Sequence, residues 1–329
     1  MATTPRAGNF TGILSAAWSP GGNLYALADA SGQVTVRQRP AQQQWSATFP
    51  RTWSLAWSPY DGQAPRLALA GDDGNVRIVD VASQKQVLIY AGHRGANVLS
   101  VAWTSAQYAP RSIISGDSKG VIHIWDPSSG ATRFTLQQAA PVTGLAASAS
   151  TIYFIAAGAP PGGIYHVWDL STGEEMVQYT NNNKGDSDTP YMSINQSLTP
   201  GTITAVGWSG DGQFVAAGDS NGNIHLLSDI ACSCFLHMSA FQAHKARINA
   251  ISWASAQPMF ATASDDGTVR TWKLSVTNQT NSWANVQGGY SKTFTNGTGA
   301  LMQAVAWSPD EAQLLYGDSA GNAGLWQVW

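Results

Sequence analysis

The sequence predicts an all-β fold, a seven-bladed β-propeller of four-stranded antiparallel blades, from three observations. Short apolar strands recur along the chain, no stretch shows helical periodicity, and one glycine holds a near-constant place in each repeating unit. Intervals between these glycines run from 42 to 59 residues, which indicates a repeat architecture. The seven marker glycines are Gly32, Gly74, Gly120, Gly163, Gly222, Gly267 and Gly321.

Each unit begins with a short strand that closes 14 to 17 positions before its marker glycine. These strand ends are Trp18, Trp57, Trp103, Ala147, Trp208, Trp253 and Trp307. A turn follows, as in SPGG and SGDG, where proline presets one dihedral and glycine or aspartate accepts the tight corner. A second strand of small residues, such as FVAAGD, then leads to the marker glycine.

The marker glycine supplies the positive φ of a hairpin between the second and third strands. The third strand closes five residues after it, at Arg37, Val79, Trp125, Trp168, Leu227, Trp272 and Trp326. A weaker fourth strand follows in most units, as in VLIY and MVQY. The longest intervals between glycines locate two insertions, at residues 181–201 and 275–289.

Bulk properties argue against several classes of protein. The 329 residues carry a formal charge of −3 with 11% charged residues, so no field suited to nucleic acid is evident. Cys232 and Cys234 are too close for an unstrained bridge, and a chain of this size without disulfides suits a reducing, cytoplasmic compartment. The apolar stretch before Asp169 is broken by Ser, Gly and Pro, so we expect buried strands and no membrane span.

The motifs HIWD (123–126), HVWD (166–169) and SDDGTVRTW (264–272) resemble those of WD-repeat propellers. The resemblance covers nearly the whole chain, but the units are degenerate, and the composition suggests a bacterial member. We therefore expect residues 1–329 to form a single propeller. Such propellers close with an N-terminal strand, and here we expect residues 2–10 to complete the last blade, although they hold Pro5, which suits only an edge strand. The alternative is a propeller cut from a longer protein.

The resemblance implies a structural tetrad in which His, Ser or Thr, Asp and Trp tie three strands of a blade together through buried hydrogen bonds. One unit matches it fully, with His244, Ser264 (or Thr262), Asp266 and Trp272. A second unit is partial: it has His93, Ser115 and Trp125, but Lys119 occupies the place of the aspartate.

Most residues that look functional fall at repeat positions. Ten tryptophans close first or third strands, and Trp53 is expected in the core as well. Trp45, Trp283 and Trp329 lie outside the register, and they leave a carbohydrate-binding, lectin-like propeller as an alternative. The paired aspartates belong to turns, and no nucleophile elbow, phosphate loop or zinc motif is present. We expect no enzyme, no metal and no cofactor, with a propeller hydrolase or lyase as a further alternative.

A binding surface is the better hypothesis. The resemblance implies that the loops before the first strands and the turns between second and third strands emerge on one face, around the central channel. That face carries Arg51, Asp72, Arg94, Lys119, Lys245, Arg247 and Asp265. Its mixed charge favours peptide recognition. The sequence therefore predicts a scaffold that binds a protein or peptide partner, as a monomer or as the module of a larger signalling protein.

Overall fold

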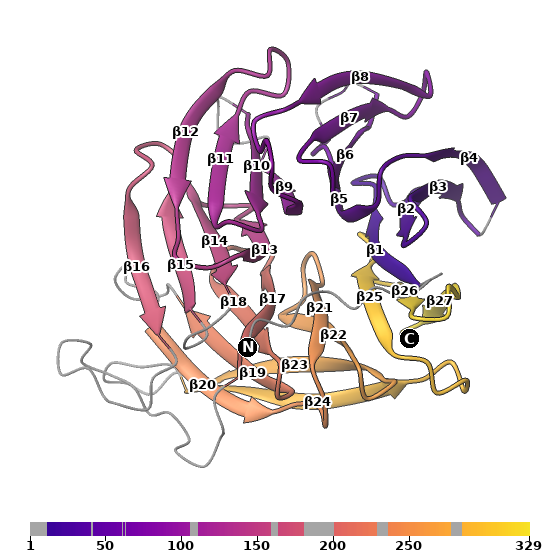
Figure 1. Ribbon diagram of the computed structural model, residues 1–329. Helices are drawn as coiled ribbons and strands as arrows, with labels where there is room; N and C mark the ends of the chain where they lie inside the picture. The colour runs from indigo at the N-terminus through magenta and orange to yellow at the C-terminus, as the bar shows by residue number, and fades with distance from the viewer. Residues whose placement is uncertain are drawn as a thin grey trace.

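The computed structural model describes residues 12–40, 42–60, 62, 64–105, 111–158, 164–180, 201–228, 236–277 and 285–329. These residues contain 27 β-strands and no helix, and the strands form seven separate antiparallel sheets. The sheets follow one another around a central axis as the blades of a propeller (Figure 1). The all-β, seven-bladed prediction is confirmed. No helix of the described chain is long and apolar enough to cross a bilayer.

Each blade pairs its strands in chain order, starting from the strand nearest the axis. The innermost strands are β1 (Ile13–Trp18), β5 (Thr52–Trp57), β9 (Val98–Trp103), β13 (Val142–Ala147), β17 (Ile203–Trp208), β21 (Ile248–Trp253) and β25 (Met302–Trp307). The second strands are β2 (Leu24–Asp29), β6 (Arg66–Gly71), β10 (Ile113–Asp117), β14 (Tyr153–Gly158), β18 (Phe214–Asp219), β22 (Met259–Ser264) and β26 (Gln313–Asp318).

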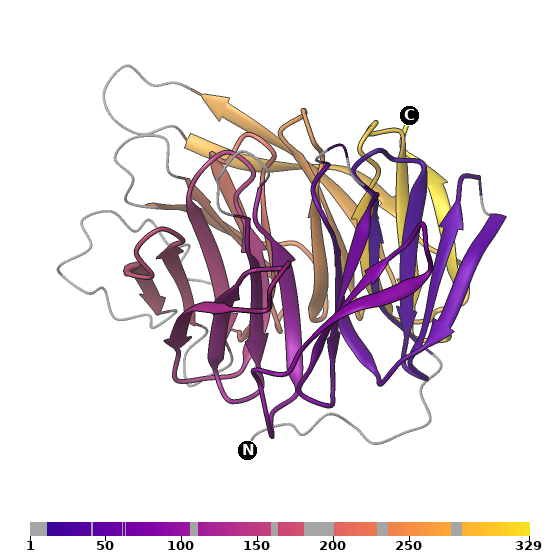
Figure 2. The ribbon, with the colours of Figure 1, turned by 90° about the horizontal axis from the view of Figure 1, so that it is seen from above.

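The outer half of each blade is less regular. The third strands are β3 (Gln33–Gln38), β7 (Val76–Asp80), β11 (Val121–Trp125), β15 (Ile164–Asp169), β19 (Asn223–Ser228), β23 (Val269–Thr277) and β27 (Ala323–Gln327). The fourth strands are β4 (Gln42–Thr48), β8 (Lys85–Tyr90), β12 (Thr132–Gln137), β16 (Glu175–Thr180), β20 (Leu236–Gln242) and β24 (Asn285–Phe294). Figure 2 shows the strands running between the two ends of the ring, where their turns gather.

The seventh blade has three strands within the described residues, β25, β26 and β27. The closing strand expected from residues 2–10 lies outside the described chain. The first and seventh blades nevertheless meet directly, because Trp18 Nε1 donates to Ala306 O at 3.2 Å and Arg39 pairs with Asp310 at 2.6 Å. Buried residues of both blades, including Ile13 and Leu315, form one apolar cluster there.

The hydrophobic core lies between neighbouring blades, since the main apolar clusters join the facing surfaces of two consecutive sheets. Close approach of the sheets requires small residues on the second strands. A Cβ on Gly116 would stand 2.3 Å from Val142 of the next blade, which no side chain tolerates. Trp57 Nε1 and Trp103 Nε1 each donate to a carbonyl of the preceding blade at 3.1 Å, and each such bond is worth about 1 kcal/mol.

The marker glycines take the predicted conformation. Gly120 has φ of +83° and a Cβ there would lie 2.2 Å from Gln138 O, so both backbone angle and space demand glycine. The other described markers also have positive φ, and Gly163 lies outside the described residues. The repeat register read from the sequence therefore places the second and third strands correctly.

Candidate recognition surface around the central channel

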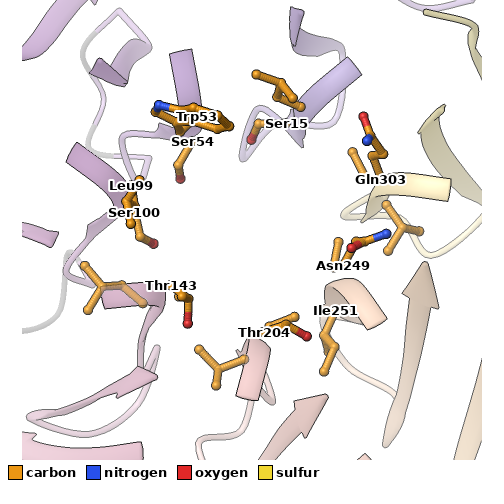
Figure 3. Close-up of a pocket in the computed structure, with 18 of the residues that line it drawn as sticks. Ser15, Trp53, Ser54, Leu99, Ser100, Thr143, Thr204, Asn249, Ile251 and Gln303 are labelled. Atoms are coloured by element: carbon orange, nitrogen blue, oxygen red, sulfur yellow. The ribbon is translucent and has the colours of Figure 1, made fainter. Parts of the chain in front are cut away.

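A cavity of about 200 Å³ occupies the axis of the ring, and the seven innermost strands line it (Figure 3). Every one of these strands carries an irregularity in its pairing with the second strand, four residues before its closing Trp or Ala. Such a β-bulge re-aims a side chain. The bulge residues all belong to the cavity lining, and they are Leu14, Trp53, Leu99, Thr143, Thr204, Asn249 and Gln303.

The bulge residues divide the lining into two arcs. In the first three blades they are Leu14, Trp53 and Leu99, which we call the apolar arc. In the last four blades they are polar and uncharged, which we call the polar arc. Trp53 was expected in the core, and this was wrong: it is only half-buried and lies at the edge of the channel (Figure 3). A bulge leaves no signature in a single sequence, so its register could not be foreseen.

Hydrogen bonds across blades engage much of the polar arc. Thr143 Oγ1 donates to Ile203 O at 3.1 Å, and Thr204 Oγ1 donates to Ile248 O. Asn249 Nδ2 donates to Met302 O at 2.9 Å. Each bond ties a bulge to the innermost strand of the following blade, so these side chains stabilise the ring. None of the residues that line the cavity carries a charge.

The seven residues predicted for the binding face lie on loops of three blades. In the second blade the Asp72 amide donates to Arg51 O at 3.0 Å. In the third blade Lys119 Nζ lies beside Gly95, next to Arg94. In the sixth blade the Asp265 amide donates to Arg247 O at 2.9 Å. The structure therefore groups the predicted residues within three separate blades. The groups are Arg51 with Asp72, Arg94 with Lys119, and Lys245 with Arg247 and Asp265.

Two of these groups touch the channel lining. The Arg51 guanidinium stands over the Trp53 ring, 5.5 Å from its centroid. On the other side of the channel, Asp265 Oδ1 accepts a hydrogen bond from Asn249 Nδ2 at 2.7 Å. Arg94, Lys119, Lys245 and Arg247 are exposed. The charged loops and the neutral channel are therefore parts of one surface.

A buried relay anchors the basic loop of the sixth blade. Trp272 Nε1 donates to Thr262 Oγ1 at 3.0 Å, Thr262 Oγ1 contacts His244 Nε2 at 2.6 Å, and His244 Nδ1 contacts Asp266 Oδ2 at 3.0 Å. Ser264 does not take this place, as its hydroxyl donates to Ala246 O instead. Thr262, the alternative candidate, is therefore the hydroxyl member of the relay. Ser264 lies two residues further along β22, at the turn.

The third blade holds the same relay in full. Trp125 Nε1 donates to Ser115 Oγ at 3.1 Å, Ser115 contacts His93 Nε2 at 2.8 Å, and His93 Nδ1 contacts Asp117 Oδ2 at 2.9 Å. The sequence predicted a partial tetrad, with Lys119 in the position of the aspartate. Asp117 supplies the acid from two residues earlier, and its second oxygen accepts the amides of Lys119 and Val121.

The donor order fixes the state of both histidines. An indole N–H can only donate and a carboxylate can only accept, so the hydroxyl proton points to Nε2 and the imidazole proton sits on Nδ1. Burial lowers the pKa of His93 and of His244, although the aspartate partner of each acts to raise it. Burial raises the pKa of Asp266, but hydrogen bonds from His244 and Thr268 outweigh this and lower it overall. In the sixth blade a neutral imidazole therefore faces an ionised carboxylate.

The third blade extends its relay with a second imidazole. His123 stacks on His93 with ring centroids 4.3 Å apart, and Tyr90 Oη bonds His123 Nδ1 at 2.7 Å. Burial first, and then the charge that His93 would carry, lower the pKa of His123 to about 4. Tyr90 also stacks on Trp125, with centroids 4.2 Å apart. The loop that carries Arg94 thus rests on four buried rings.

The other candidate residues of the sequence do not form a metal site within the described part of the chain. No group of three His, Cys, Asp or Glu side chains in the described part of the chain could hold a metal ion. Cys232 and Cys234 lie outside that part, as do Trp283 and most of the insertion at 181–201. Trp45 is half-buried and packs against Phe49, whereas Trp329 is 69% exposed.

The structure is a seven-bladed β-propeller in which the third and the sixth blade each contain a buried Trp–hydroxyl–His–Asp relay. Comparison with known proteins agrees with this class. The family "WD domain, G-beta repeat" matches residues 192–227 and 235–273, and the family "Anaphase-promoting complex subunit 4 WD40 domain" matches residues 16–106. These matches support a WD-repeat propeller.

Curated relatives are similar at low identity. A guanine nucleotide-binding protein subunit beta of Oryza sativa subsp. japonica is 22% identical over 77% of this chain and 63% of its own length. The counterpart of Solanum tuberosum is 24% identical over 55% of this chain and 45% of its length. Protein transport protein SEC31 of Chaetomium globosum is 24% identical over 64% of this chain and 16% of its length. These relatives are eukaryotic, and the expected bacterial origin stays a prediction.

Proposed function

We propose that this propeller is a non-catalytic scaffold that binds a protein or peptide partner on the loop face around its channel. The observation that carries the proposal is the continuity of charged loops and neutral channel: Arg51 stacks on Trp53, and Asp265 bonds Asn249. Binding surfaces of this kind combine apolar anchors with a polar, charged rim. The relays under Arg94 and Lys245 preorganise two of the loops, which lowers the cost of binding.

The comparisons support a protein partner. One relative is named as a subunit of a guanine nucleotide-binding protein and another as a protein transport protein. The matched region spans 63% of the first and 16% of the second, so the partners of those proteins do not transfer to this chain. We propose a protein or peptide ligand, with the chain acting as a monomer or as the module of a larger signalling protein in the cytoplasm.

The alternatives have weaker support. A propeller hydrolase or lyase would need acids or histidines that converge in the channel, whereas the lining is built from Ser, Thr, Asn, Gln and apolar residues. A lectin-like propeller would need a platform of exposed indoles. Trp329 is exposed, but Trp45 is half-buried on a different blade. We therefore favour the scaffold.

Affinity capture from the source organism's lysate tests the proposal. The bait would be the wild-type chain, the double variant Arg94→Glu and Lys119→Glu, and the variant Arg247→Glu. The matched control is Lys85→Glu, which makes the same charge change on an exposed residue of β8. We expect the loop variants to lose a partner that the control retains. Identical partners for all four baits would contradict the proposed face.

A further inference from the structure

Each blade contributes one hydroxyl or carboxamide side chain to the wall of the axial cavity. In the polar arc this is the bulge residue itself, and the residue that follows it is Gly or Ala. In the apolar arc the bulge residue is Leu or Trp, and the residue that follows it is a serine. The three serines are Ser15, Ser54 and Ser100. The wall is therefore a closed ring of neutral polar groups, and polar atoms make up most of its exposed surface.

The three serine hydroxyls each have a proton left to donate. Ser15 Oγ accepts the Leu55 amide at 3.2 Å, and Ser54 Oγ accepts the Val101 amide at 3.3 Å. Within the described part of the chain neither hydroxyl donates in turn, and the hydroxyl of the buried Ser100 has no partner at all. The hydroxyls of Ser54 and Ser100 face the opening (Figure 3). Donors in such a place need an acceptor from outside the protein.

The polar arc supplies acceptors. Thr143 Oγ1 and Thr204 Oγ1 donate their protons to the next blade, and each oxygen keeps lone pairs. Asn249 Nδ2 donates two hydrogen bonds, which leaves Oδ1 of the same amide as an acceptor. Gln303 Oε1 is buried and accepts no hydrogen bond from the described residues. The cavity therefore offers donors on one side and acceptors on the other.

This wall selects for a neutral ligand that carries several hydroxyls. An ion would lose its hydration without gaining an opposite charge, because no lining residue is charged. An apolar ligand would leave the serine protons unpaired. A hydroxyl both donates and accepts, so it can serve either side of the cavity. A cavity of about 150 Å³ holds benzene, so the 200 Å³ here accommodates one six-membered ring with hydroxyl substituents.

We infer that the axial cavity binds one small, neutral, polyhydroxylated ring, of the class of monosaccharides and cyclitols. The serine hydroxyls donate to the hydroxyl oxygens of the ring, and the polar arc accepts the hydroxyl protons. The indole of Trp53, at the edge of the opening, offers an apolar face to the C–H groups of the ring (Figure 3). This inference goes beyond the proposed function, and it does not use Trp45 or Trp329, the indoles of a lectin-like platform.

Titration with small molecules tests the site. The probes are D-glucose, D-galactose, D-mannose and myo-inositol, measured by saturation-transfer difference NMR and isothermal titration calorimetry. The comparators are D-glucuronate, which adds a carboxylate, and cyclohexanol, which keeps a single hydroxyl. We expect at least one neutral polyol to bind with a Kd on the order of 1 mM, and both comparators to bind about tenfold more weakly. No saturable binding of any of the four, or a comparator that binds as tightly as the best polyol, would overturn the inference.

Serine variants locate the binding in the cavity. Ser100→Ala should weaken the tightest polyol about fivefold and leave the melting temperature unchanged, since its hydroxyl has no partner in the described chain. Ser54→Ala is the second variant, although it also removes the acceptor of the Val101 amide. Ser252→Ala is the matched control, because Ser252 lies on β21 outside the lining and its hydroxyl accepts the Trp307 amide. Unchanged affinity in both Ser54→Ala and Ser100→Ala would contradict the site.

Methyl glycosides of the three sugars distinguish the source of the ligand. Binding equal to that of the free sugar indicates the terminal residue of a larger glycan, and binding of the free sugar alone indicates a soluble molecule; both results support the site. The outcome is also separable from the proposed function. Failure of every polyol leaves the recognition face standing, and captured partners that are insensitive to Arg94→Glu and Arg247→Glu leave the cavity site standing.

Discussion

The third and sixth blades both contain a Trp–hydroxyl–His–Asp relay, yet they build it differently. In the sixth blade the acid is Asp266, directly before the marker glycine, and it is half-buried. In the third blade the acid is Asp117, three residues before the glycine, and it is buried. In the third blade His123 also stacks on His93, and Tyr90 stacks on Trp125.

The difference shows that the relay is defined by where its atoms meet and not by sequence position. A carboxylate at the end of the second strand and one in the following turn can both reach His Nδ1. Each relay also ends beside a basic loop residue, Arg94 after His93 and Lys245 after His244. We therefore regard the two relays as supports for the two basic edges of the recognition surface.

Removal of the relay histidines should have the largest effect. His93→Ala removes the partner of Asp117 Oδ2 and one of the two relay partners of the Ser115 hydroxyl, and it opens a cavity beside Tyr90 and His123. We expect a loss of about 3 kcal/mol in the free energy of unfolding, measured by urea denaturation. His244→Ala should cost about 2 kcal/mol, because Asp266 is partly solvated and also contacts Arg270. Losses below about 1 kcal/mol for both would show that the relays do not support the fold.

Substitutions of the relay aspartates test the same difference between the third and the sixth blade. Asp117→Asn should cost about 2 kcal/mol of unfolding free energy, since Asp117 serves both His93 and the turn amides of Lys119 and Val121. Asp266→Asn should cost about 1 kcal/mol because of its partial exposure. Lys119→Ala is the matched control, expected within about 0.5 kcal/mol of wild type. A larger loss of unfolding free energy for Lys119→Ala than for Asp117→Asn would contradict the assignment of Asp117 as the acid of this relay.

The hydroxyl member of the sixth blade can be assigned by two shape-matched substitutions. Thr262→Val keeps the side-chain volume but leaves Trp272 Nε1 and His244 Nε2 without their partner. We expect it to lower the unfolding free energy by about 1.5 kcal/mol. Ser264→Ala removes the bond to Ala246 O and the bond from the Asp266 amide, which stays near solvent in the turn, and should cost about 1 kcal/mol. The reverse order of the two melting temperatures would contradict the assignment.

Acid should destabilise the third blade more than the sixth. The folded-state pKa of each relay histidine is below its unfolded value, so the unfolded chain binds more protons as the pH falls. The stability that these groups contribute is complete above about pH 6.5 and declines below it. For His123 the decline continues to about pH 4. At pH 5.5 His123 should cost about 1 kcal/mol.

The third blade has two histidines with a lowered pKa, His93 and His123, and the sixth has one, His244. Single substitutions can therefore separate the contributions of the two blades to the pH dependence of stability. His123→Gln should flatten the fall in unfolding free energy between pH 7.5 and pH 5.5, and so should His244→Gln. A slope that is unchanged in both variants would mean that the pKa of these imidazoles is the same in the folded and the unfolded chain.

The repeat was predictable from the sequence because it depends on local chemistry. A marker glycine requires positive φ, and a strand of small residues lets the next blade approach, so the register from Gly32 to Gly321 located the described strands. The relay of the third blade was missed because only the position before Gly120 was considered for the acid. Ser264 and Thr262 lie two residues apart on one strand face, and the sequence could not distinguish them. The bulges that turn Trp53 and Asn249 toward the channel are backbone events with no residue signature.

Hydrogen exchange of the chain with its captured partner bound tests most directly whether the two supported loops form the recognition surface. We predict slower amide exchange in residues 49–55, 91–99 and 243–251, which hold the basic loops and the start of β5, β9 and β21. Turns at the opposite end of the ring, at residues 58–60 and 126–131, should exchange at the rate of the free chain. Protection confined to those opposite turns, with the basic loops unchanged, would contradict the account.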